Sequence, residues 1–531
     1  MTPTPLVELR SRPVDRPRRA ARRPAPDGRR DDLVWRSGRL ELRFRRSADG
    51  PVALTRLVAG SVETHFAHPV PLVEVLAVRR DRPTGVDRLV PAAVGAELRY
   101  VAHSVSADGT TIEIVSETPR GIRAAVTLHG RDGAFRSSAV VSNGTGGPVP
   151  IAVITSWAAP LGVRLDKGDA PDPAADWDLV EGRVAPGAGA VWSTLPLRSR
   201  ELLGDPVGYA ASPPRGSVVR SSEGAATARA ALPAAALPGA ALPVAGLRSE
   251  RQEVTWLWEV ASDAPWRWEV GGHRGDCRVT LSGAAPDGAS AAALAPGASR
   301  SSAMSLVAVG TDLEDAAAAL TRGRRALRGP HLDDAPTAAP DGTDAAPVDL
   351  LRAAGTAAAA PLSTLPERAA TPAPVPPGAT PELTAFALVT RLTRPAPTAD
   401  DGDGDGDDRL HPDQRALVAE ATRTADALRD GIACSVPLWP LGLPAADDRW
   451  ASVAHDAGDA VVVSVWDRGD DAGTAVLSFP SLVGRRVDVT TAFPTRLAAW
   501  DAEWEAGRGI LTVRSVPGGP SARVLQLRRR S

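Results

Sequence analysis

The sequence contains very little cysteine and very little lysine. Its 531 residues include two cysteines, Cys277 and Cys434, which lie far apart and lack the spacing of a metal site. A disulfide framework is therefore not expected, and a reducing cytoplasmic compartment is favoured. Lys167 is the only lysine, so arginine supplies almost all of the basic charge. We attribute this bias to the nucleotide composition of the genome rather than to chemistry.

An excess of charge and long apolar runs are also missing. The chain has 61 basic and 63 acidic residues, for a formal net charge of -2. This balance gives no reason to expect nucleic acid or a membrane as a partner. Residues 1–31 are rich in Arg and Pro without the apolar core of a signal peptide, which predicts a disordered leader. A nucleic-acid-binding arm is the alternative, and no other part of the sequence supports it.

Patterns for cofactors and metals are absent as well. There is no Gly-x-Ser-x-Gly elbow, Walker loop or dinucleotide fingerprint. His65 and His68 lie three residues apart without a third ligand, so a surface pair is favoured over a metal site. The Asp/Gly stretch 400–408 suggests a calcium loop, but Pro412 stands where an EF-hand needs its glutamate. A solvated acidic loop is therefore favoured, and we expect neither a cofactor nor a metal.

What is present, from residue 32 to 309, is a series of short strands separated by turn residues. Ala96–His103 alternates apolar and polar residues like a half-buried strand, and Thr111–Val115 and Arg123–Leu128 follow after turn signals. Asn143–Gly147 is a further loop. Regular short strands over this length predict a large antiparallel N-terminal sandwich, or β-supersandwich.

Two segments interrupt or close this region. Ala225–Gly246 repeats Leu-Pro at five-residue intervals, which predicts a low-complexity loop rather than a central strand. Residues 310–330 predict a helix, because Thr311 and Glu314 have the spacing of a capping box and Gly329-Pro330 would end it.

The second half of the chain begins with a change of composition. Residues 331–379 are dominated by Ala, Pro, Thr and Asp without an aromatic residue, which predicts a low-complexity linker. Residues 380–436 predict two short helices. The first begins at Thr380-Pro381-Glu382, and the second spans Pro412–Arg429. Residues 437–531 predict a small C-terminal β-sandwich, whose clearest strands are Ala460–Trp466, Ile510–Ser515 and Ala522–Leu527.

Several segments in this order carry a family resemblance. They are Pro71-Leu-Val-Glu-Val-Leu-Ala77, Leu98-Arg-Tyr-Val-Ala-His103, Trp266-Arg-Trp-Glu269 with Gly271-Gly272, Leu320-Thr-Arg-Gly-Arg-Arg-Ala-Leu-Arg-Gly-Pro-His331, Thr384-Ala-Phe-Ala-Leu-Val389, Gln414-Arg-Ala-Leu-Val-Ala-Glu420, Pro437-Leu-Trp-Pro-Leu-Gly-Leu-Pro444, Asp448-Arg-Trp450, Val465-Trp466 and Pro520-Ser-Ala-Arg523. Together they resemble the flanking regions of melibiase-type α-galactosidases of actinobacteria. The resemblance implies an N-terminal β-supersandwich, a catalytic (β/α) barrel and a C-terminal β domain.

The chain departs from that family where the barrel should be. A (β/α)8 barrel needs about 250 residues, whereas the matched flanks are separated here by the linker alone. The resemblance places the two catalytic carboxylates in a Lys-Trp-Asp-type motif and a Gly-Gly-Gly-Arg-x-Asp-type motif, and neither motif occurs. Val465-Trp466-Asp467 is similar in letters, but it lies in the predicted C-terminal sandwich. No catalytic residue can be assigned, and the expected fold is mainly β without a complete barrel.

Tryptophan is the remaining feature of interest, with 13 in the chain. Trp256 and Trp258 alternate along one strand, as do Trp266 and Trp268, so each pair points to one face of a sheet. Packing between two sheets is the favoured interpretation. A carbohydrate-binding platform at Trp266 and Trp268 is the alternative, because sugar rings stack on exposed aromatic faces.

Three hypotheses for function follow. The preferred one is an α-galactosidase-family protein, related to carbohydrate metabolism, that lacks the barrel and does not hydrolyse its ligand. The second is an α-galactosidase acting on terminal α-galactosides, with the barrel supplied by another chain or lost from an incorrectly assembled gene. The third is a non-catalytic carbohydrate-binding or oligomerisation module, since uncovered sandwich faces favour a homo-oligomer.

Overall fold

The structure, a computed structural model, describes most of the chain in segments. These are residues 32–66, 68–77, 93–162, 164, 173–185, 189–199, 202–203, 217–221, 241–261, 266–273, 276–283, 293–328, 379–392, 410–444 and 448–530. The predicted leader, all but the last residue of the predicted linker, and the Asp/Gly stretch 400–408 lie outside them. The interpretations of those three segments therefore stay predictions.

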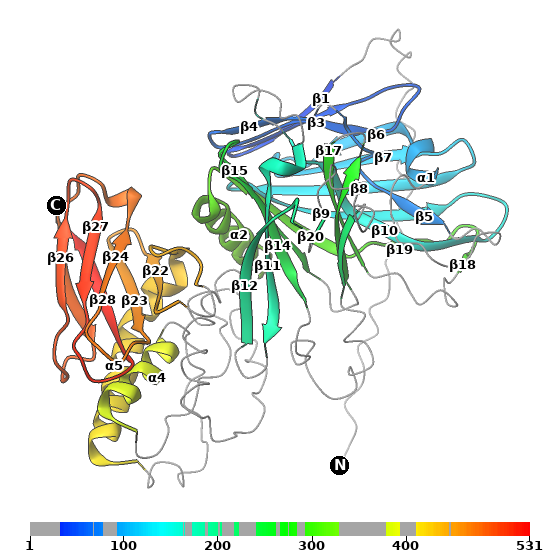
Figure 1. The fold of residues 1–531 in the computed structure, drawn as a ribbon. Coiled ribbons are helices and arrows are strands. Elements are labelled where there is room, and N and C mark those ends of the chain that lie inside the picture. The colour runs from blue at the N-terminus through cyan, green and yellow to red at the C-terminus, as the bar shows by residue number, and fades with distance from the viewer. Residues whose placement is uncertain are drawn as a thin grey trace, which may run out of the picture.

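Three antiparallel sheets form the N-terminal unit (Figure 1). A four-stranded sheet joins β1 (Asp32–Ser37), β2 (Leu40–Arg45), β3 (Ala53–Ala59) and β4 (Val62–His65). A ten-stranded sheet has the order β12 (Gly189–Pro196), β11 (Asp178–Ala185), β14 (Ala241–Ser249), β15 (Val254–Ala261), β20 (Met304–Gly310), β9 (Ala134–Asn143), β8 (Ile122–Arg131), β7 (Thr111–Glu117) and β6 (Arg99–Val105), with β19 (Ser299–Ser301) beside β9. A six-stranded sheet has the order β13 (Ser217–Ser221), β16 (Trp266–His273), β17 (Asp276–Gly283), β10 (Val149–Pro160) and β18 (Ala293–Leu294), with β5 (Val75–Ala77) on β10.

One apolar core fills the space between the ten-stranded sheet and the other two. The four-stranded sheet covers the β6–β9 end, where a Cβ at Gly130 would lie only 2.9 Å from the ring of Trp35. The six-stranded sheet covers the β14–β20 end, where most of the tryptophans meet. The predicted antiparallel N-terminal sandwich is therefore confirmed.

Strand β14 corrects one prediction. The Leu-Pro repeats were expected to exclude a central strand, yet Ala241–Ser249 pairs with β11 on one side and β15 on the other. Pro243 is tolerated because the pairing with β11 shifts register between Glu181 and Arg183, and the pairing with β15 begins only at Val244. The proline therefore stands where the ladder requires no amide donor.

Strand β6 corrects a second prediction. The expected half-buried strand Ala96–His103 is a short helix α1 (Ala93–Glu97) followed by an edge strand. Only Leu98 of the expected apolar face is fully buried, and residues 101–105 are exposed. Edge strands lack a neighbour on one side, so the alternating pattern here does not mark a half-buried position.

Helix α2 (Leu313–Arg328) lies on the outer face of the ten-stranded sheet and confirms the predicted helix. Its cap is one residue later than predicted. The side chain of Asp312 accepts a hydrogen bond from the amide of Asp315, and that of Asp315 accepts one from the amide of Thr311. Asp312 and Asp315 thus take the roles expected of Thr311 and Glu314. Glu314 is left free of capping and reaches the C-terminal unit instead.

The C-terminal unit consists of two helices and a sandwich (Figure 1). Helix α4 (Pro381–Leu392) begins where predicted, with Thr380 accepting from the amide of Leu383. Helix α5 (Pro412–Cys434) begins at the predicted proline but continues five residues beyond Arg429, because Gly431 does not end it. Both helices pack on the five-stranded sheet through Phe386, Leu417 and their neighbours.

Eight strands complete this sandwich, as predicted. The five-stranded sheet has the order β21 (Val436–Leu438), β22 (Trp450–Asp456), β23 (Ala460–Asp467), β28 (Ser521–Arg529) and β25 (Val487–Phe493). The three-stranded sheet has the order β24 (Thr474–Ser478), β27 (Ile510–Arg514) and β26 (Asp501–Glu505). A separate apolar core lies between the two sheets.

Every strand pair in the described residues is antiparallel. A (β/α)8 barrel is made of parallel strands. The part of the chain that the structure describes therefore contains no closed barrel, which agrees with the predicted fold class.

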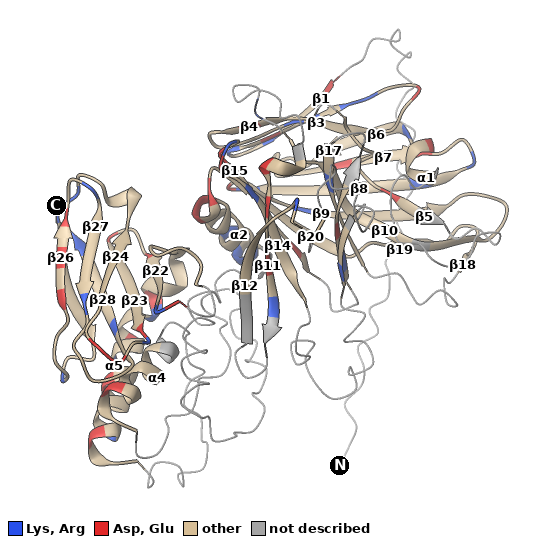
Figure 2. Cartoon of the chain, viewed as in Figure 1, with Lys and Arg blue, Asp and Glu red and all other residues tan. Residues whose placement is uncertain are grey.

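Charge is distributed as the composition suggested. Figure 2 shows acidic and basic segments interspersed over both β units. Among the described helices, none combines the length and apolar character that crossing a membrane requires.

Candidate functional site

The two tryptophans proposed as a carbohydrate platform lie on β16, on the face turned toward the ten-stranded sheet. Trp266 is 6 % exposed and Trp268 is fully buried. Trp268 makes an edge-to-face contact with Trp258 at 5.8 Å between ring centroids, and its indole nitrogen donates to the carbonyl of Leu242 at 3.3 Å. These contacts are those of core packing, as the favoured interpretation expected. Sugar binding at Trp266 and Trp268 stays a prediction, and neither ring offers an open face for it.

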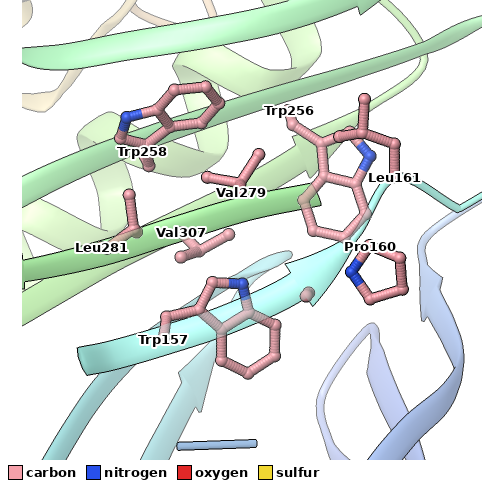
Figure 3. Close-up of a pocket in the computed structure, with 9 residues that line it drawn as sticks. Trp157, Pro160, Leu161, Trp256, Trp258, Val279, Leu281 and Val307 are labelled. Atoms are coloured by element: carbon pink, nitrogen blue, oxygen red, sulfur yellow. The ribbon is translucent and has the colours of Figure 1, made fainter. Parts of the chain in front are cut away.

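A small cavity lies among the neighbouring tryptophans. Figure 3 shows the rings of Trp157, Trp256 and Trp258 around it, from one strand of each of the two facing sheets, β10 and β15. Its volume of about 10 Å³ has room for about one water-sized molecule. Sites for small-molecule ligands usually measure roughly 300–1,000 Å³. This cavity therefore cannot hold a sugar ring without movement of the sheets.

Charged side chains gather at the end of the same sandwich, where β11 faces β13. The carboxylate of Glu181 is 1 % exposed and accepts two hydrogen bonds from Arg220, at 2.8 and 2.9 Å, in a fork-like pair. Arg183, two residues along the strand, donates to the same carboxylate at 2.8 Å. The guanidinium of Arg220 also lies 5.9 Å from the ring centroid of Trp268. This cluster joins the two sheets beside the predicted site.

The electrostatics of this cluster keep its carboxylate ionised. Burial alone would raise the pKa of Glu181, but the hydrogen bonds from Arg220 and Arg183 outweigh it and hold the pKa below its usual range. A general acid in glycoside hydrolysis needs the opposite shift, toward neutrality. Glu181 is therefore unsuited to proton donation, and its two oxygens are already used by the arginines.

A second group of polar side chains lies on the other face of β16. Arg267 donates to Glu269 at 3.0 Å, and Glu269 is 1 % exposed. Thr280 and Ser282 of β17 stand directly opposite Glu269 and Arg267 in the ladder, so all four side chains share the outer face of the six-stranded sheet. None of them was singled out from the sequence, because Ser, Thr, Arg and Glu in alternating positions are typical of an ordinary solvated strand face.

Asp467, the acid nearest in sequence to a family motif, lies at the end of β23 in the C-terminal sandwich, where it was expected. It is 1 % exposed. Its carboxylate accepts from Arg449 at 2.8 and 3.1 Å, from the amide of Gly469 at 2.9 Å and from the hydroxyl of Ser515 at 2.6 Å. All of its strong acceptor positions are used to tie the sandwich together.

His65, one of the two histidines weighed as a metal site, has a carboxylate beside it. His65 lies 2.8 Å from Glu63 on the four-stranded sheet. Within the described ranges, no group of three or more His, Cys, Asp or Glu could hold a metal ion.

Comparison with known proteins adds a structural likeness. No protein-family model and no curated protein sequence matches the chain. Among solved structures, the GH36 α-galactosidase AgaA from Geobacillus stearothermophilus, as a variant bound to raffinose, is similar with a TM-score of 0.54 and 10 % identity, over 94 % of this chain and 100 % of that chain. AgaB from the same organism gives 0.54 and 10 %, over 94 % and 99 %. The galactosidase domain of the α-galactosidase–sucrose kinase AgaSK gives 0.53 and 9 %, over 94 % and 98 %.

The chain has an α-galactosidase-like fold. At this level of identity, the likeness concerns the arrangement of the backbone. It agrees with the resemblance drawn from the flanking segments. In the described residues, the α-galactosidase-like fold is represented by its β units and helices.

Proposed function

We propose that this chain is a non-hydrolytic protein of the α-galactosidase structural group that binds carbohydrate. The observation that carries the proposal is the state of four carboxylates, three of them buried. Glu181, Glu269 and Asp467 are each 1 % exposed and each is paired with arginine, and Glu382 is paired with the buried Arg523. Each carboxylate already has a cation that stabilises its charge.

Retaining glycoside hydrolysis requires two carboxyl groups about 5–5.5 Å apart, one ionised and one protonated. Pairing with arginine favours the ionised form and blocks attack by the oxygen that accepts the hydrogen bonds. A rigid scaffold that aims both groups at one sugar is needed as well. The absence of a closed barrel from the described residues and the paired carboxylates therefore both support a non-hydrolytic role.

An activity assay tests the proposal directly. The purified full chain is incubated with an aryl α-galactoside such as p-nitrophenyl α-galactoside, and release of the phenol is followed against a no-enzyme control. We expect no release above the control. A rate well above the control, abolished by heat denaturation, would overturn the proposal.

An active α-galactosidase is the second candidate, and the names of the similar structures favour it. It requires a barrel from another chain or a gene that was incorrectly assembled. Resequencing the locus separates these cases. An uninterrupted gene with no barrel-encoding sequence nearby rules out this candidate, whereas a barrel fragment in frame or in an adjacent gene supports it.

Carbohydrate binding is the part of the proposal that concerns the ligand. The similar structures include α-galactosidase complexes with raffinose and stachyose, and we extend this ligand class to the present chain as a proposal. Tryptophan fluorescence titrated with galactose, melibiose and raffinose measures it. Changes that saturate support binding, and flat titrations with all three sugars contradict it.

Compartment and assembly belong to the same proposal. Cys277 and Cys434 form no disulfide with each other, which fits a cytoplasmic protein. We also propose a division into an N-terminal unit of residues 32–309, a linking helix over 310–330, and a C-terminal unit over 380–531. A homo-oligomer would cover the faces that a barrel covers in a complete enzyme. Light scattering during size-exclusion chromatography tests this, with a monomer mass contradicting it.

A further inference from the structure

Strand β6 forms an open edge of the ten-stranded sheet. It is the last strand in the order of that sheet and pairs with β7 on one side only. Residues 101–108 are all exposed. They include two large apolar side chains, Val101 at 49 % and Val105 at 48 % exposure. An edge of this kind presents unpaired backbone groups together with apolar side chains, so it is able to accept a further strand.

The direction of the backbone groups along this edge follows from the pairing with β7. The amide of Ser106 donates to the carbonyl of Thr111 at 2.9 Å, and the register is regular from Ala102 to Val105. Successive residues of an antiparallel strand direct their backbone groups to opposite sides. The amides and carbonyls of His103 and Val105 therefore point away from β7, toward the side on which no described strand pairs.

Strand β6 lacks most of the features with which edge strands oppose further pairing, namely charged residues, prolines and bulges. From Tyr100 to Val105 it contains neither proline, arginine nor an acidic residue. A register shift between Tyr100 and Ala102 disturbs the start of the strand but leaves residues 102–105 regular. By contrast, β26 at the edge of the three-stranded sheet carries an acidic residue at every second position. Like charges oppose the pairing of two such strands, and β6 has no barrier of this kind.

The two ends of this edge carry opposite charges. Arg99 begins β6, and its guanidinium donates to nearby backbone carbonyls at 2.8 and 3.1 Å. Asp108 lies in the turn that follows β6. Hydrogen bonds from the hydroxyls of Ser106 and Thr110 and from the amide of Thr110 lower the pKa of Asp108 to about 2, so it is ionised. Two copies of this edge that run antiparallel place the basic end of each beside the acidic end of the other.

We infer that β6 is the docking edge for a second copy of this chain, which pairs antiparallel with it across a twofold axis and extends the ten-stranded sheet. A twofold axis uses the same strand from each copy, so the pairing is self-complementary. With the axis beside Ser104, His103 lies opposite Val105 of the second copy, and their outward backbone groups bond in both directions. Arg99 then lies next to Asp108 of the second copy.

This interface goes beyond the proposed function, because it requires neither a sugar nor a hydrolytic site. It also differs from an assembly through the faces that a barrel would cover, because it uses the edge of a sheet. A single pair of strands is a small interface, in the class below about 1,200 Å² that forms transient complexes. We therefore expect a dimer that dissociates on dilution.

Sedimentation velocity of the full chain measures this dimer. Concentrations from about 1 to 200 µM span the range in which a micromolar Kd is visible. We expect monomer to convert to dimer as the concentration rises. A chain that stays monomeric throughout overturns the inference and leaves the edge for a segment of the same chain or for a different protein.

Val105→Pro is the variant that removes the interface. Proline lacks only the amide that points away from β7, so no hydrogen bond within the sheet is lost. Because the twofold axis doubles the loss, we expect the Kd of the dimer to rise at least about tenfold.

Val105→Thr is the matched control, since it keeps the amide and the branched shape, and it is expected to dimerise like the wild type. Val140→Thr changes another exposed valine of the same sheet, 39 % exposed, with the same expectation. If Val105→Pro leaves the dimer intact, or if Val105→Thr weakens it equally, the inference is overturned. An intact dimer of Val105→Pro places the assembly on another surface and leaves the proposed function untouched.

Two charge variants test the antiparallel arrangement. Arg99→Glu and Asp108→Arg each place like charges together at both ends of the paired edge, so each variant alone is expected to dimerise less than the wild type. An equimolar mixture restores two opposite-charge pairs and is expected to form a mixed dimer, which roughly 0.5 M salt weakens by screening. A mixture with no more dimer than the separate solutions contradicts the antiparallel pairing.

Hydrogen exchange of the wild type decides the question without a variant, and therefore also if Val105→Pro does not fold. The backbone amides of residues 99–108 are compared at about 1 and 200 µM, concentrations on either side of a micromolar Kd. We expect slower exchange at the higher concentration in this segment, because pairing protects the outward amides of His103 and Val105. A dimer that forms without slower exchange in this segment overturns the docking edge.

Discussion

Asp467 in the C-terminal sandwich and Glu269 in the N-terminal unit are equally buried, at 1 % exposure, and both pair with arginine. Asp467 accepts hydrogen bonds on both oxygens from a guanidinium, an amide and a hydroxyl. Glu269 accepts on one oxygen only, and its other oxygen and the two nearby hydroxyls are unused by the described residues. The two carboxylates are thus equally buried but differ in how many of their acceptor positions the described residues use.

The same contrast separates the two β units more widely. In the C-terminal unit, the buried Arg523 donates to Glu382 of α4 at 2.8 and 3.0 Å and to the carbonyls of Ala498 and Ala522. Its guanidinium also lies 5.3 Å from the ring centroid of Trp500. One side chain thus connects the sandwich to the helix that precedes it. Polar groups of the C-terminal unit should therefore matter more for stability than those on the outer face of the six-stranded sheet.

The largest effect is expected from Arg523→Ala. It leaves Glu382 without its partner at the N-terminus of α4 and removes a fully buried cation that also donates to the carbonyls of Ala498 and Ala522. Breaking a buried ion pair costs about 3–5 kcal/mol. Urea unfolding of the full chain measures the loss. Arg530→Ala removes an exposed pair with Asp488 and serves as the control, with no measurable change expected because water screens exposed ion pairs. Equal losses in both variants would remove the distinction.

The next largest effect is expected in the pH dependence of stability, through His455 of β22. Burial, and then the nearby Arg325, lowers the pKa of His455 from 6.5 to about 4. Between pH 6.5 and 4, His455 is therefore protonated in the unfolded chain and neutral in the folded chain. His455 should lower the stability by about 3 kcal/mol as the pH drops from 6.5 to 4, and His455→Gln should remove this contribution to the slope.

Urea unfolding at intervals across this range measures the effect. His68→Gln, at an exposed position, keeps the wild-type slope if burial is the cause. A slope that survives in His455→Gln would contradict the assignment and place the protonation elsewhere.

A smaller effect is expected from Asp467→Asn. The asparagine side chain keeps the shape of the carboxylate but loses its charge, so the hydrogen bonds from Arg449 weaken. It is also a poorer acceptor for the backbone amide of Gly469 or the hydroxyl of Ser515. Because Arg449 is 36 % exposed, water replaces part of the lost interaction, and about 1–2 kcal/mol is expected. A chemical unfolding curve gives the value. No loss would mean that Asp467 does not hold the sandwich together.

The smallest effect on stability is expected from Glu269→Gln. Its amide oxygen can still accept from Arg267, and removing a buried charge lowers the desolvation cost, so the change should stay below about 1 kcal/mol. Unfolding curves measured beside those of Asp467→Asn make the comparison direct. A larger loss in Glu269→Gln than in Asp467→Asn would reverse the roles we assign to the two carboxylates.

The fold could be predicted from the sequence wherever the signal was local. Turn residues between alternating strands located both sandwiches, and Thr380-Pro381 located the start of α4. The errors came from strand pairings between distant parts of the chain, which the local sequence does not specify. The alternating pattern of residues 96–103 predicted a half-buried strand, but burial depends on which strand pairs beside it. Pro243 argued against a central strand, but a register shift in β11 removed the need for its amide.

The candidate site was less predictable than the fold. Trp266 and Trp268 were singled out because aromatic residues are conspicuous in a sequence, but the sequence alone did not show that both are buried between two sheets. Glu269, Thr280 and Ser282 come together only through the pairing of β16 with β17. Glu181 and Arg220 lie 39 residues apart and meet only across two sheets. No local pattern contains such information.

The one-residue displacement of the α2 cap has a mechanical consequence. Because Asp312 and Asp315 cap the N-terminus of α2, Glu314 is available to accept a hydrogen bond from the backbone amide of Trp439 at 2.8 Å. Near the C-terminal end of the helix, Arg325 donates to the carbonyl of Ser435 at 2.6 Å. Helix α2 therefore contacts the C-terminal unit through two side chains that lie eleven residues apart, or about 16 Å along the helix axis. A single contact would allow the C-terminal unit to rotate about it, whereas two contacts at this separation restrict that rotation. The orientation of one β unit against the other is therefore set by a helix rather than by the chain that connects them.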